Sequence, residues 1–104
     1  MKEFQSRVLE LASRIPKGKV TSYREIARAM GKPRAYRAVA NALATNPYQI
    51  RIPCHRVIRS NGKVGGYGGS IQDSANKARI LASEGVKIKD QKVDLSKFLF
   101  KLRS

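Results

Sequence analysis

Hydrophobic residues recur at helical spacing at the start of the chain. The recurring positions lie three or four residues apart and are Phe4, Val8, Leu11, Ala12 and Ile15. This period puts them on one face of a helix. It predicts an amphipathic helix over about residues 4–14, which Pro16 ends because proline cannot continue a helix.

A second, shorter helix is predicted to begin at Ser22. The segment Ser22-Tyr23-Arg24-Glu25 has the form of a capping box. In that motif Ser22 accepts from the amide three residues on, and Glu25 reaches back to the Ser22 amide. We expect this helix to pass through Met30 and to end at Gly31.

A third helix is predicted over about residues 34–44. It carries Arg34 and Arg37 together with small residues that permit close packing or close approach to a ligand, namely Ala35, Ala38, Ala40, Ala42 and Ala44. Two short helices joined by a turn with Gly31 predict a helix-turn-helix.

The periodicity changes after Asn46-Pro47. Short apolar pairs replace the helical pattern, and Ser60-Asn61-Gly62-Lys63 predicts a hairpin turn after Arg56-Val57-Ile58-Arg59. The cluster Gly65-Gly66-Tyr67-Gly68-Gly69 follows. A glycine cluster is commonly a flexible linker, but Tyr67 at its centre favours a shaped wall whose amides approach a bound group.

The last third predicts one helix and a docking tail. The helix covers about residues 73–84, with Asp73 near its cap and Gly85 at its end. Its expected inward residues are Ala75, Ala78, Ile80, Leu81 and Ala82. The spacing of Leu95, Phe98, Leu99 and Leu102 indicates a short docking helix.

These elements predict a mainly α fold: a small winged-helix-like helix-turn-helix domain with a short β-hairpin after the cysteine-containing loop. No linker divides the chain, so we expect residues 1–104 to form a single domain and a monomer.

Charge narrows the choice of partner. The chain carries 22 Lys plus Arg against 7 Asp plus Glu, a formal net charge of +15. Nucleic acid is the first candidate partner. A membrane is disfavoured, because no segment approaches the roughly 18 apolar residues of a spanning helix and Met1-Lys2-Glu3-Phe4 does not begin a signal peptide. We therefore expect a cytoplasmic location, associated with the nucleoid through DNA, or a nuclear one.

The single cysteine and the single histidine are neighbours, in Pro53-Cys54-His55-Arg56. No Asp or Glu occurs from Ile26 to Gln72, and positive surroundings lower a thiol pKa and raise the reactive thiolate fraction. A buried, inert cysteine is the plainer interpretation of the tetrapeptide alone. One Cys and one His cannot supply the four ligands of a structural zinc site, so we expect no metal and no cofactor.

The tetrapeptide and its surroundings resemble a known family. Pro53-Cys54-His55-Arg56, preceded by Asn46-Pro47 and followed by Val64-Gly65-Gly66-Tyr67-Gly68-Gly69, is similar to the active-site domain of the O⁶-alkylguanine-DNA alkyltransferases. The resemblance runs from about Phe4 to about Gly85 and includes Ser22-Tyr23 and Arg37-Ala38-Val39 in order. Family members usually carry a further N-terminal domain, which we expect to be absent here, and the residues beyond Val86 match nothing in the resemblance.

The resemblance implies a suicide methyltransferase. The cysteine matching Cys54 takes the alkyl group from guanine O⁶ and keeps it, so one protein repairs one lesion. The histidine matching His55 removes the thiol proton through a water, and the glutamate matching Glu84 orients that imidazole. Asn46 would tie the cysteine turn to the helix-turn-helix, although a plain turn cap is the simpler role. Glu84 could equally be a solvated residue at a helix end.

The resemblance also implies contacts with double-stranded DNA that contains O⁶-alkylguanine. Arg37 would fill the gap left by a flipped base, and Tyr23 would push on the target phosphate and donate to the purine N3. A plain phosphate contact for Arg37 and a core position for Tyr23 are the simpler alternatives. The remaining residues expected to contact DNA are Arg34, Arg56 and Ala38, on or near an inserted minor-groove helix.

The resemblance further implies a lesion pocket built from backbone groups. The carbonyls of Cys54 and Val57 would accept from the guanine amine, and amides near Tyr67, Gly68 and Gly69 would donate to O⁶. An amide at O⁶ both selects guanine and stabilises the anion that leaves.

Three other functions stay open. An alkyltransferase-like protein binds alkylated guanine without repairing it and lacks the cysteine, which is present here. A small basic architectural or regulatory helix-turn-helix protein would carry an incidental cysteine. A cysteine hydrolase would rest on the Cys-His pair alone.

Overall fold

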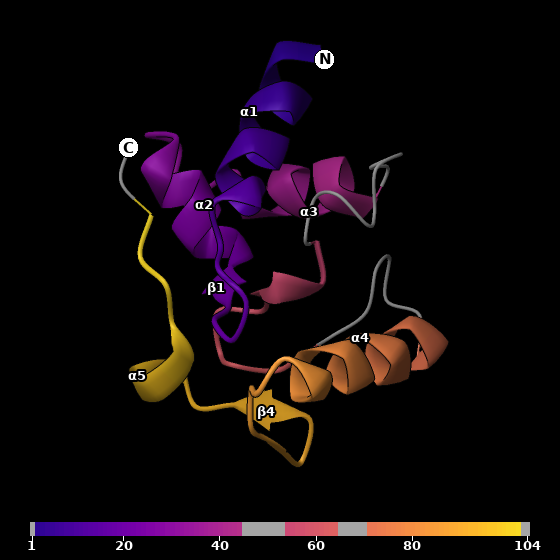
Figure 1. Ribbon diagram of the computed structural model, residues 1–104. Coiled ribbons are helices and arrows are strands. Elements are labelled where there is room, and N and C mark those ends of the chain that lie inside the picture. The colour runs from indigo at the N-terminus through magenta and orange to yellow at the C-terminus, as the bar shows by residue number, and fades with distance from the viewer. Residues whose placement is uncertain (1, 45–53, 65–70, 103–104) are drawn as a thin grey trace.

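The computed structural model describes residues 2–44, 54–64 and 71–102. Its elements in chain order are α1 (Lys2–Ser13), β1 (Thr21–Ser22), α2 (Tyr23–Ala29), α3 (Tyr36–Ala44), the 3₁₀ turn η1 (Cys54–Arg56), β2 (Val57–Ile58), α4 (Ile71–Ser83), β3 (Ile88–Lys89), β4 (Lys92–Val93) and α5 (Leu95–Phe98) (Figure 1). The mainly helical character expected from the periodicity is confirmed. None of the helices in these ranges is both long enough and apolar enough to span a bilayer.

Helices α1, α2 and α3 pack together around the first hydrophobic core. The predicted apolar face of α1 is buried, with Val8, Leu11 and Ala12 each fully shielded from solvent. The two shorter helices have the order and turn expected of a helix-turn-helix, and Gly31 after α2 adopts a φ of +74°. The helix-turn-helix therefore rests on α1 as its support (Figure 1).

The cap of α2 is half of what the sequence predicts. Ser22 accepts from the Glu25 amide at 2.9 Å, which confirms the N-cap. The Glu25 carboxylate, expected to reach the Ser22 amide, accepts instead from Arg28 and from the backbone amide of Leu102 at 2.9 Å. A strongly paired acid at this place holds the end of the chain against α2.

A parallel pair of short strands joins the helix-turn-helix to the cysteine turn. Strand β1 pairs with β2 in the register Thr21 with Val57 and Ser22 with Ile58. Because β2 follows η1 directly, this pairing fixes the position of Cys54–Arg56 relative to the start of α2. Two-residue strands carry no readable alternation, so the sequence does not predict this link.

The turn predicted after β2 is present at the expected place, but the β-hairpin predicted around it is wrong. Gly62 adopts a φ of +89°, and the Arg59 amide donates to the Lys63 carbonyl at 3.0 Å. The two segments that flank the turn do not pair with each other. Strand β2 pairs with β1, and Lys63 forms an antiparallel bridge with Lys92.

The C-terminal third differs most from expectation. Helix α4 buries Leu81 as predicted. The prediction that Ile80 and Ala82 also face inward is wrong, because Ile80 is 44% exposed and Ala82 is exposed as well. Lys77 occupies a buried position on this helix, 1% exposed. A lysine is seldom placed in a core from sequence alone.

The tail docks mainly as an extended segment. Helix α5 covers only four residues, and Leu99 beyond it is extended, with φ −69° and ψ 126°. The Val20 amide donates to the Phe98 carbonyl at 2.9 Å, and the Phe100 amide donates to the Val20 carbonyl at 2.7 Å. Strands β3 and β4, which precede α5, form an antiparallel hairpin that the apolar spacing did not predict.

Candidate active site and nucleic-acid interface

The cysteine turn is held by the strand that follows it and by α4. Cys54 is the first residue of η1, whose chain runs directly into buried β2. Helix α4 lies against η1. The backbone of Cys54 is therefore placed between the end of the helical layer and α4, and its neighbours His55 and Arg56 are half-buried.

Glu84 brings His55 and Arg56 together. It follows α4 directly, and its Oε1 lies 3.0 Å from His55 Nε2. Arg56 donates through Nε to the same oxygen at 3.0 Å and through its terminal nitrogen to Oε2 at 2.6 Å. The three side chains are 11–16% exposed, so the cluster is largely removed from water. A bidentate arginine fixes both position and charge of a carboxylate.

Electrostatics give the cluster a defined protonation state. The Arg56 hydrogen bonds are the main reason why the pKa of Glu84 lies below its usual value of 4.5, against the opposing effect of burial. Burial lowers the pKa of His55 from its usual 6.5, and the Glu84 carboxylate offsets this only in part. At neutral pH the pair is therefore an ionised carboxylate beside a neutral imidazole.

This state selects one histidine tautomer. An ionised carboxylate only accepts, so His55 Nε2 carries the hydrogen in the contact with Glu84. Nδ1 of the neutral ring is then left with a lone pair that can take a proton. The arrangement supplies a base on the residue that follows Cys54 in the chain, and an adjacent base is the usual means of activating a thiol.

Arg56 is hydrogen-bonded inside the protein. Besides its two bonds to Glu84, Arg56 donates to the Ile15 carbonyl at 2.8 Å. Three of the five N–H groups of this guanidinium are thus engaged inside the protein. These bonds give Arg56 a structural role, and its contact with DNA stays a prediction. Sequence reasoning missed Glu84 as its partner because the two residues lie far apart along the chain.

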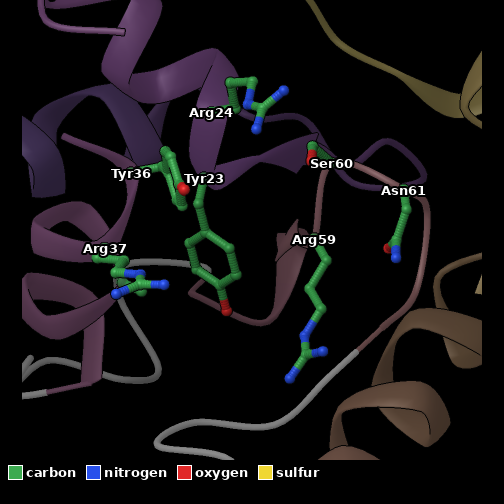
Figure 2. A pocket seen from close by; sticks show the side chains of 8 residues that line it. Tyr23, Arg24, Tyr36, Arg37, Arg59, Ser60 and Asn61 are labelled. Atoms are coloured by element: carbon green, nitrogen blue, oxygen red, sulfur yellow. The ribbon is translucent and has the colours of Figure 1, made fainter. Parts of the chain in front are cut away.

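A basic hollow lies beside the helix-turn-helix. It has a volume of about 490 Å³ and is lined by Tyr23 and Arg24 of α2, Tyr36, Arg37 and Ala40 of α3, and Arg59, Ser60 and Asn61 of the hairpin turn. In Figure 2 the ring of Tyr23 extends between the side chains of Arg37 and Arg59. The structure thus brings together the two residues, Tyr23 and Arg37, that we expected to act on a flipped nucleotide.

Several lining residues were not predicted as site residues. Arg24 lies over the Tyr36 ring, 5.3 Å from its centroid, in a cation–π contact that orders the wall between α2 and α3. Arg59 enters from the hairpin turn. The sequence did offer a signal for both arginines: Arg24 follows Tyr23, and Arg59 precedes the predicted turn at Ser60.

Lys77 is the other site residue that sequence reasoning missed. Its Nζ donates to the Tyr23 hydroxyl at 3.1 Å and lies 5.4 Å from the centroid of that ring. An ammonium group has only donors, so the Tyr23 oxygen accepts here and its own proton points elsewhere. Lys77 thereby turns the Tyr23 hydroxyl into an oriented donor.

The other expected residues divide into three groups. Arg34, just before α3, and Ala38, on α3, are exposed. The side chain of Val57 is fully buried in the core, so only its backbone could meet a base. Residues Asn46, Tyr67, Gly68 and Gly69 lie outside the described ranges. The described residues contain no cluster of His, Cys, Asp and Glu suited to a metal ion.

Comparison with known proteins places these features in a family. Residues 3–86 match the family described as 6-O-methylguanine DNA methyltransferase, DNA binding domain. The methylated-DNA--protein-cysteine methyltransferase of Methanothermobacter thermautotrophicus is 48% identical over 90 residues, which is 86% of this chain and 48% of that protein. The match to the Methanosarcina barkeri protein of the same name is 51% over 69 residues, 44% of its length. The chain thus spans about half the length of these relatives.

Two solved structures show the same fold. The Mycobacterium tuberculosis OGT in complex with DNA is 46% identical, with a TM-score of 0.71 over 80% of this chain and 49% of that chain. Atl1 of S. pombe, in complex with damaged DNA containing O6-carboxymethylguanine, is 33% identical, with a TM-score of 0.87 over 97% of each chain. This second match extends into the tail after Val86, for which the resemblance gave no match. On the family match and on these identities, the chain belongs to the 6-O-methylguanine DNA methyltransferase family.

Proposed function

We propose that this protein repairs O⁶-alkylguanine in DNA by moving the alkyl group to Cys54 in a single turnover. The observation that carries the proposal is the pairing of His55 with Glu84 immediately beside Cys54. It supplies a neutral imidazole of defined tautomer where a thiol needs a base. The names of the relatives support transfer to a cysteine as the reaction of the family.

The reaction has a simple balance. The Cys54 thiol gives its proton to His55 Nδ1, directly or through a water, and the imidazolium is stabilised by the Glu84 carboxylate. The thiolate attacks the alkyl carbon, so an S–C bond forms while the C–O⁶ bond breaks. The leaving guanine anion takes up one proton, equivalent to the one that Cys54 gave up, so that His55 ends neutral and guanine is released. The thioether formed on Cys54 is stable and no later step removes the alkyl group, so each protein molecule reacts once.

Delivery of the base is assigned to the basic hollow. Flipping a nucleotide costs a few kcal/mol of stacking, which a side chain inserted into the duplex offsets. Arg37 and Tyr23 line the hollow together, in keeping with an arginine that fills the stack and a phenol that acts on the displaced nucleotide. Arg34, exposed just before α3, and Ala38, exposed on it, would contact the DNA around them. The two DNA complexes among the solved relatives support duplex DNA as the partner.

For the lesion pocket we propose the backbone groups that the resemblance implies. Backbone carbonyls of Cys54 and Val57 would receive the guanine amine, and amides of Tyr67, Gly68 and Gly69 would donate to O⁶. Asn46 would couple the cysteine turn to α3.

A second candidate function is binding of alkylated guanine without repair. The observation that favours it is the match to Atl1 over 97% of both chains. The presence of Cys54 favours transfer, because alkyltransferase-like proteins lack that residue.

Intact-mass analysis separates the two functions. The protein is mixed with an oligonucleotide duplex that contains one O⁶-methylguanine. We expect the protein mass to rise by one methylene group, at Cys54 by peptide mapping, with one equivalent consumed per lesion. The Cys54→Ser variant should bind the same duplex and gain no mass, because an unactivated hydroxyl is a weak nucleophile. Binding by the unaltered protein without any mass gain would establish the second function instead.

A further inference from the structure

Three lysines meet on the C-terminal hairpin. Lys92 of β4 pairs with Lys89 of β3 in the hairpin ladder, and on its other side Lys92 forms an antiparallel bridge with Lys63. Three neighbouring chain segments thus place a lysine at the same level of the sheet. We call Lys63, Lys92 and Lys89 the lysine row.

Backbone geometry puts the row on the outer face. The Val93 amide donates to the Gly62 carbonyl and the Val64 amide to the Gln91 carbonyl, both at 2.8 Å. These bonds flank Lys63 and Lys92, so the two form a non-hydrogen-bonded pair, the kind whose side chains lie closest. The alternate positions Val64 and Val93 are 0% and 4% exposed, so they face the core and the lysines face solvent.

The charges of the row are left without acidic neighbours in the hairpin ladder. All three lysines are exposed, and no ion pair found within the described ranges includes one of them. The hairpin itself has one acid, Asp90, in its turn, and Asp94 after it is used to cap α5. Like charges opposite each other across strands are unfavourable. The arrangement therefore favours an anion that lies across the hairpin.

The row begins where the basic hollow ends. Arg59 and Asn61 line the hollow, and the Arg59 amide donates to the Lys63 carbonyl at 3.0 Å across the turn. Figure 2 shows Arg59 and Asn61 on one side of Tyr23 and Arg37 on the other. Positively charged side chains therefore continue from Arg59 in the hollow to the lysine row at the β3–β4 hairpin, on the side of the hollow away from α3.

We propose that the lysine row binds backbone phosphates of the DNA on one flank of the target nucleotide. The proposal rests on the proposed function for its partner, since the row continues a hollow that would receive DNA. Lys89 and Lys92 lie outside the matched residues 3–86, so this surface adds to the family's DNA-binding domain. Nucleic acid fits better than an acidic protein, because lysines on flexible stems follow an evenly charged backbone and the row offers no apolar pocket for an anchor.

The test replaces the three lysines together with glutamine and measures affinity for a lesion-containing duplex at several salt concentrations. Each phosphate contact contributes about 0.9 to the slope of log affinity against log salt. Losing three contacts should make the slope shallower by about 2.7. Between 50 and 200 mM salt, that corresponds to a difference of about 40-fold in how much affinity falls.

Two controls make the result specific. Lys17, Lys97 and Lys101 are also exposed, and their triple change to glutamine removes the same charge elsewhere. The change of the row to arginine keeps its charge and should keep the slope. Shortening the duplex on one side of the lesion should abolish the difference between the unaltered protein and the glutamine variant, and shortening it on the other side should preserve that difference.

Each outcome decides the proposal. An unchanged slope in the row variant, an equal change in the control triple, or equal effects of shortening either flank would overturn it. Thermal unfolding of the row variant shows that it is folded, and we expect no loss of melting temperature because like charges are removed. Methyl uptake is measured separately on the unaltered protein. If that protein binds DNA through the row and gains no methyl group, the proposed transfer fails and the row stands.

Discussion

At the residue scale, Glu84 holds the reactive cluster in one state. Its two oxygens receive Arg56, and one of them also receives His55. Arg56 in turn is tied to the Ile15 carbonyl beyond the end of α1, so the orientation of the imidazole depends on a contact with the helical layer. The resemblance identified Glu84 and His55 but not this anchor, because Arg56 lies far from Ile15 and Glu84 along the chain.

Replacing Glu84 by glutamine tests the cluster. The variant keeps the shape, but its amide group can donate to His55 Nε2 and favour the tautomer whose Nδ1 carries hydrogen. We expect methyl transfer to slow by about 10²-fold while DNA affinity stays the same. Single-turnover mass analysis measures the rate. Glu10→Gln is the matched control, because Glu10 is also bonded to two arginines, Arg7 and Arg14, on the exposed face of α1.

The same cluster predicts a pH dependence. His55 acts as a base only when neutral, and burial lowers its pKa below 6.5. Transfer should therefore persist below pH 6.5 and fall as the pH drops through the lowered value. Removal of the Glu84 charge takes away an influence that raises this pKa, so the acid limb should move to lower pH in Glu84→Gln. An acid limb at the same pH in both proteins would remove His55 as the base.

Lys77 and Tyr23 should act as one unit. Lys77→Met leaves a side chain of similar length that cannot donate, and Tyr23→Phe removes the oxygen that receives it. If the lysine works by orienting the phenol, each change should slow transfer from duplex DNA and the double variant should be no slower than Tyr23→Phe alone. A double-mutant cycle on single-turnover rates measures this. Rates that multiply would mean that the two residues act independently.

At the element scale, local signals predicted well and distant pairings did not. Apolar spacing located α1, α2, α3 and α4, and Ser22 and Gly62 marked a cap and a turn through chemistry confined to a few residues. The parallel pair β1–β2 and the β3–β4 hairpin escaped, because strands of two residues have no alternation to read. The β3–β4 turn is made by Asp90 and Gln91 at positive φ, in place of the glycine that announces such turns.

Gly62 offers a test of how the hairpin turn holds the C-terminal part in place. A Cβ there would lie 2.7 Å from the Val93 carbonyl oxygen, in addition to the strain of a φ of +89°. Gly62→Ala should lower the free energy of unfolding by at least about 2 kcal/mol. Gly31→Ala is the control, because φ is +74° and nothing lies within 4 Å, so only about 1 kcal/mol of backbone strain applies. Chemical denaturation of both variants measures the difference, and equal losses would contradict the close contact.

At the scale of the whole molecule, the fold divides the basic residues behind the net charge of +15 into two groups with different roles. Arginines that bind carboxylates, such as Arg28 and Arg56, serve the structure, whereas Arg37 and Arg59 line the hollow. Composition alone indicated a polyanionic partner, but it could not tell these two groups apart. The acid-free interval contained both kinds.

Arg37 should matter only where a base must leave a duplex. Arg37→Ala removes the side chain that would fill the stack, so transfer from duplex DNA should slow while reaction with free O⁶-alkylguanine base stays unchanged. Lys17→Ala, which removes an exposed charge outside the hollow, should change neither rate. The transfer rate is measured in parallel on duplex DNA and on the free base. An equal loss of rate on both substrates in Arg37→Ala would contradict the flipping role.

The docked tail has a consequence for how the molecule opens. Leu102 is bonded to Glu25 across 77 positions of the chain, and Phe98 and Phe100 are bonded to Val20. In Figure 1 this segment runs from α5 alongside α2, so it connects the β3–β4 hairpin and α5 to the helix-turn-helix. Closing so long a loop is costly in entropy. Opening the tail breaks a few hydrogen bonds and exposes Leu102, which is buried in the α1–α3 core, but it leaves the other residues of that core packed. The tail amides should therefore exchange with solvent deuterium sooner than those of α1, through a partial opening that leaves the helical layer folded.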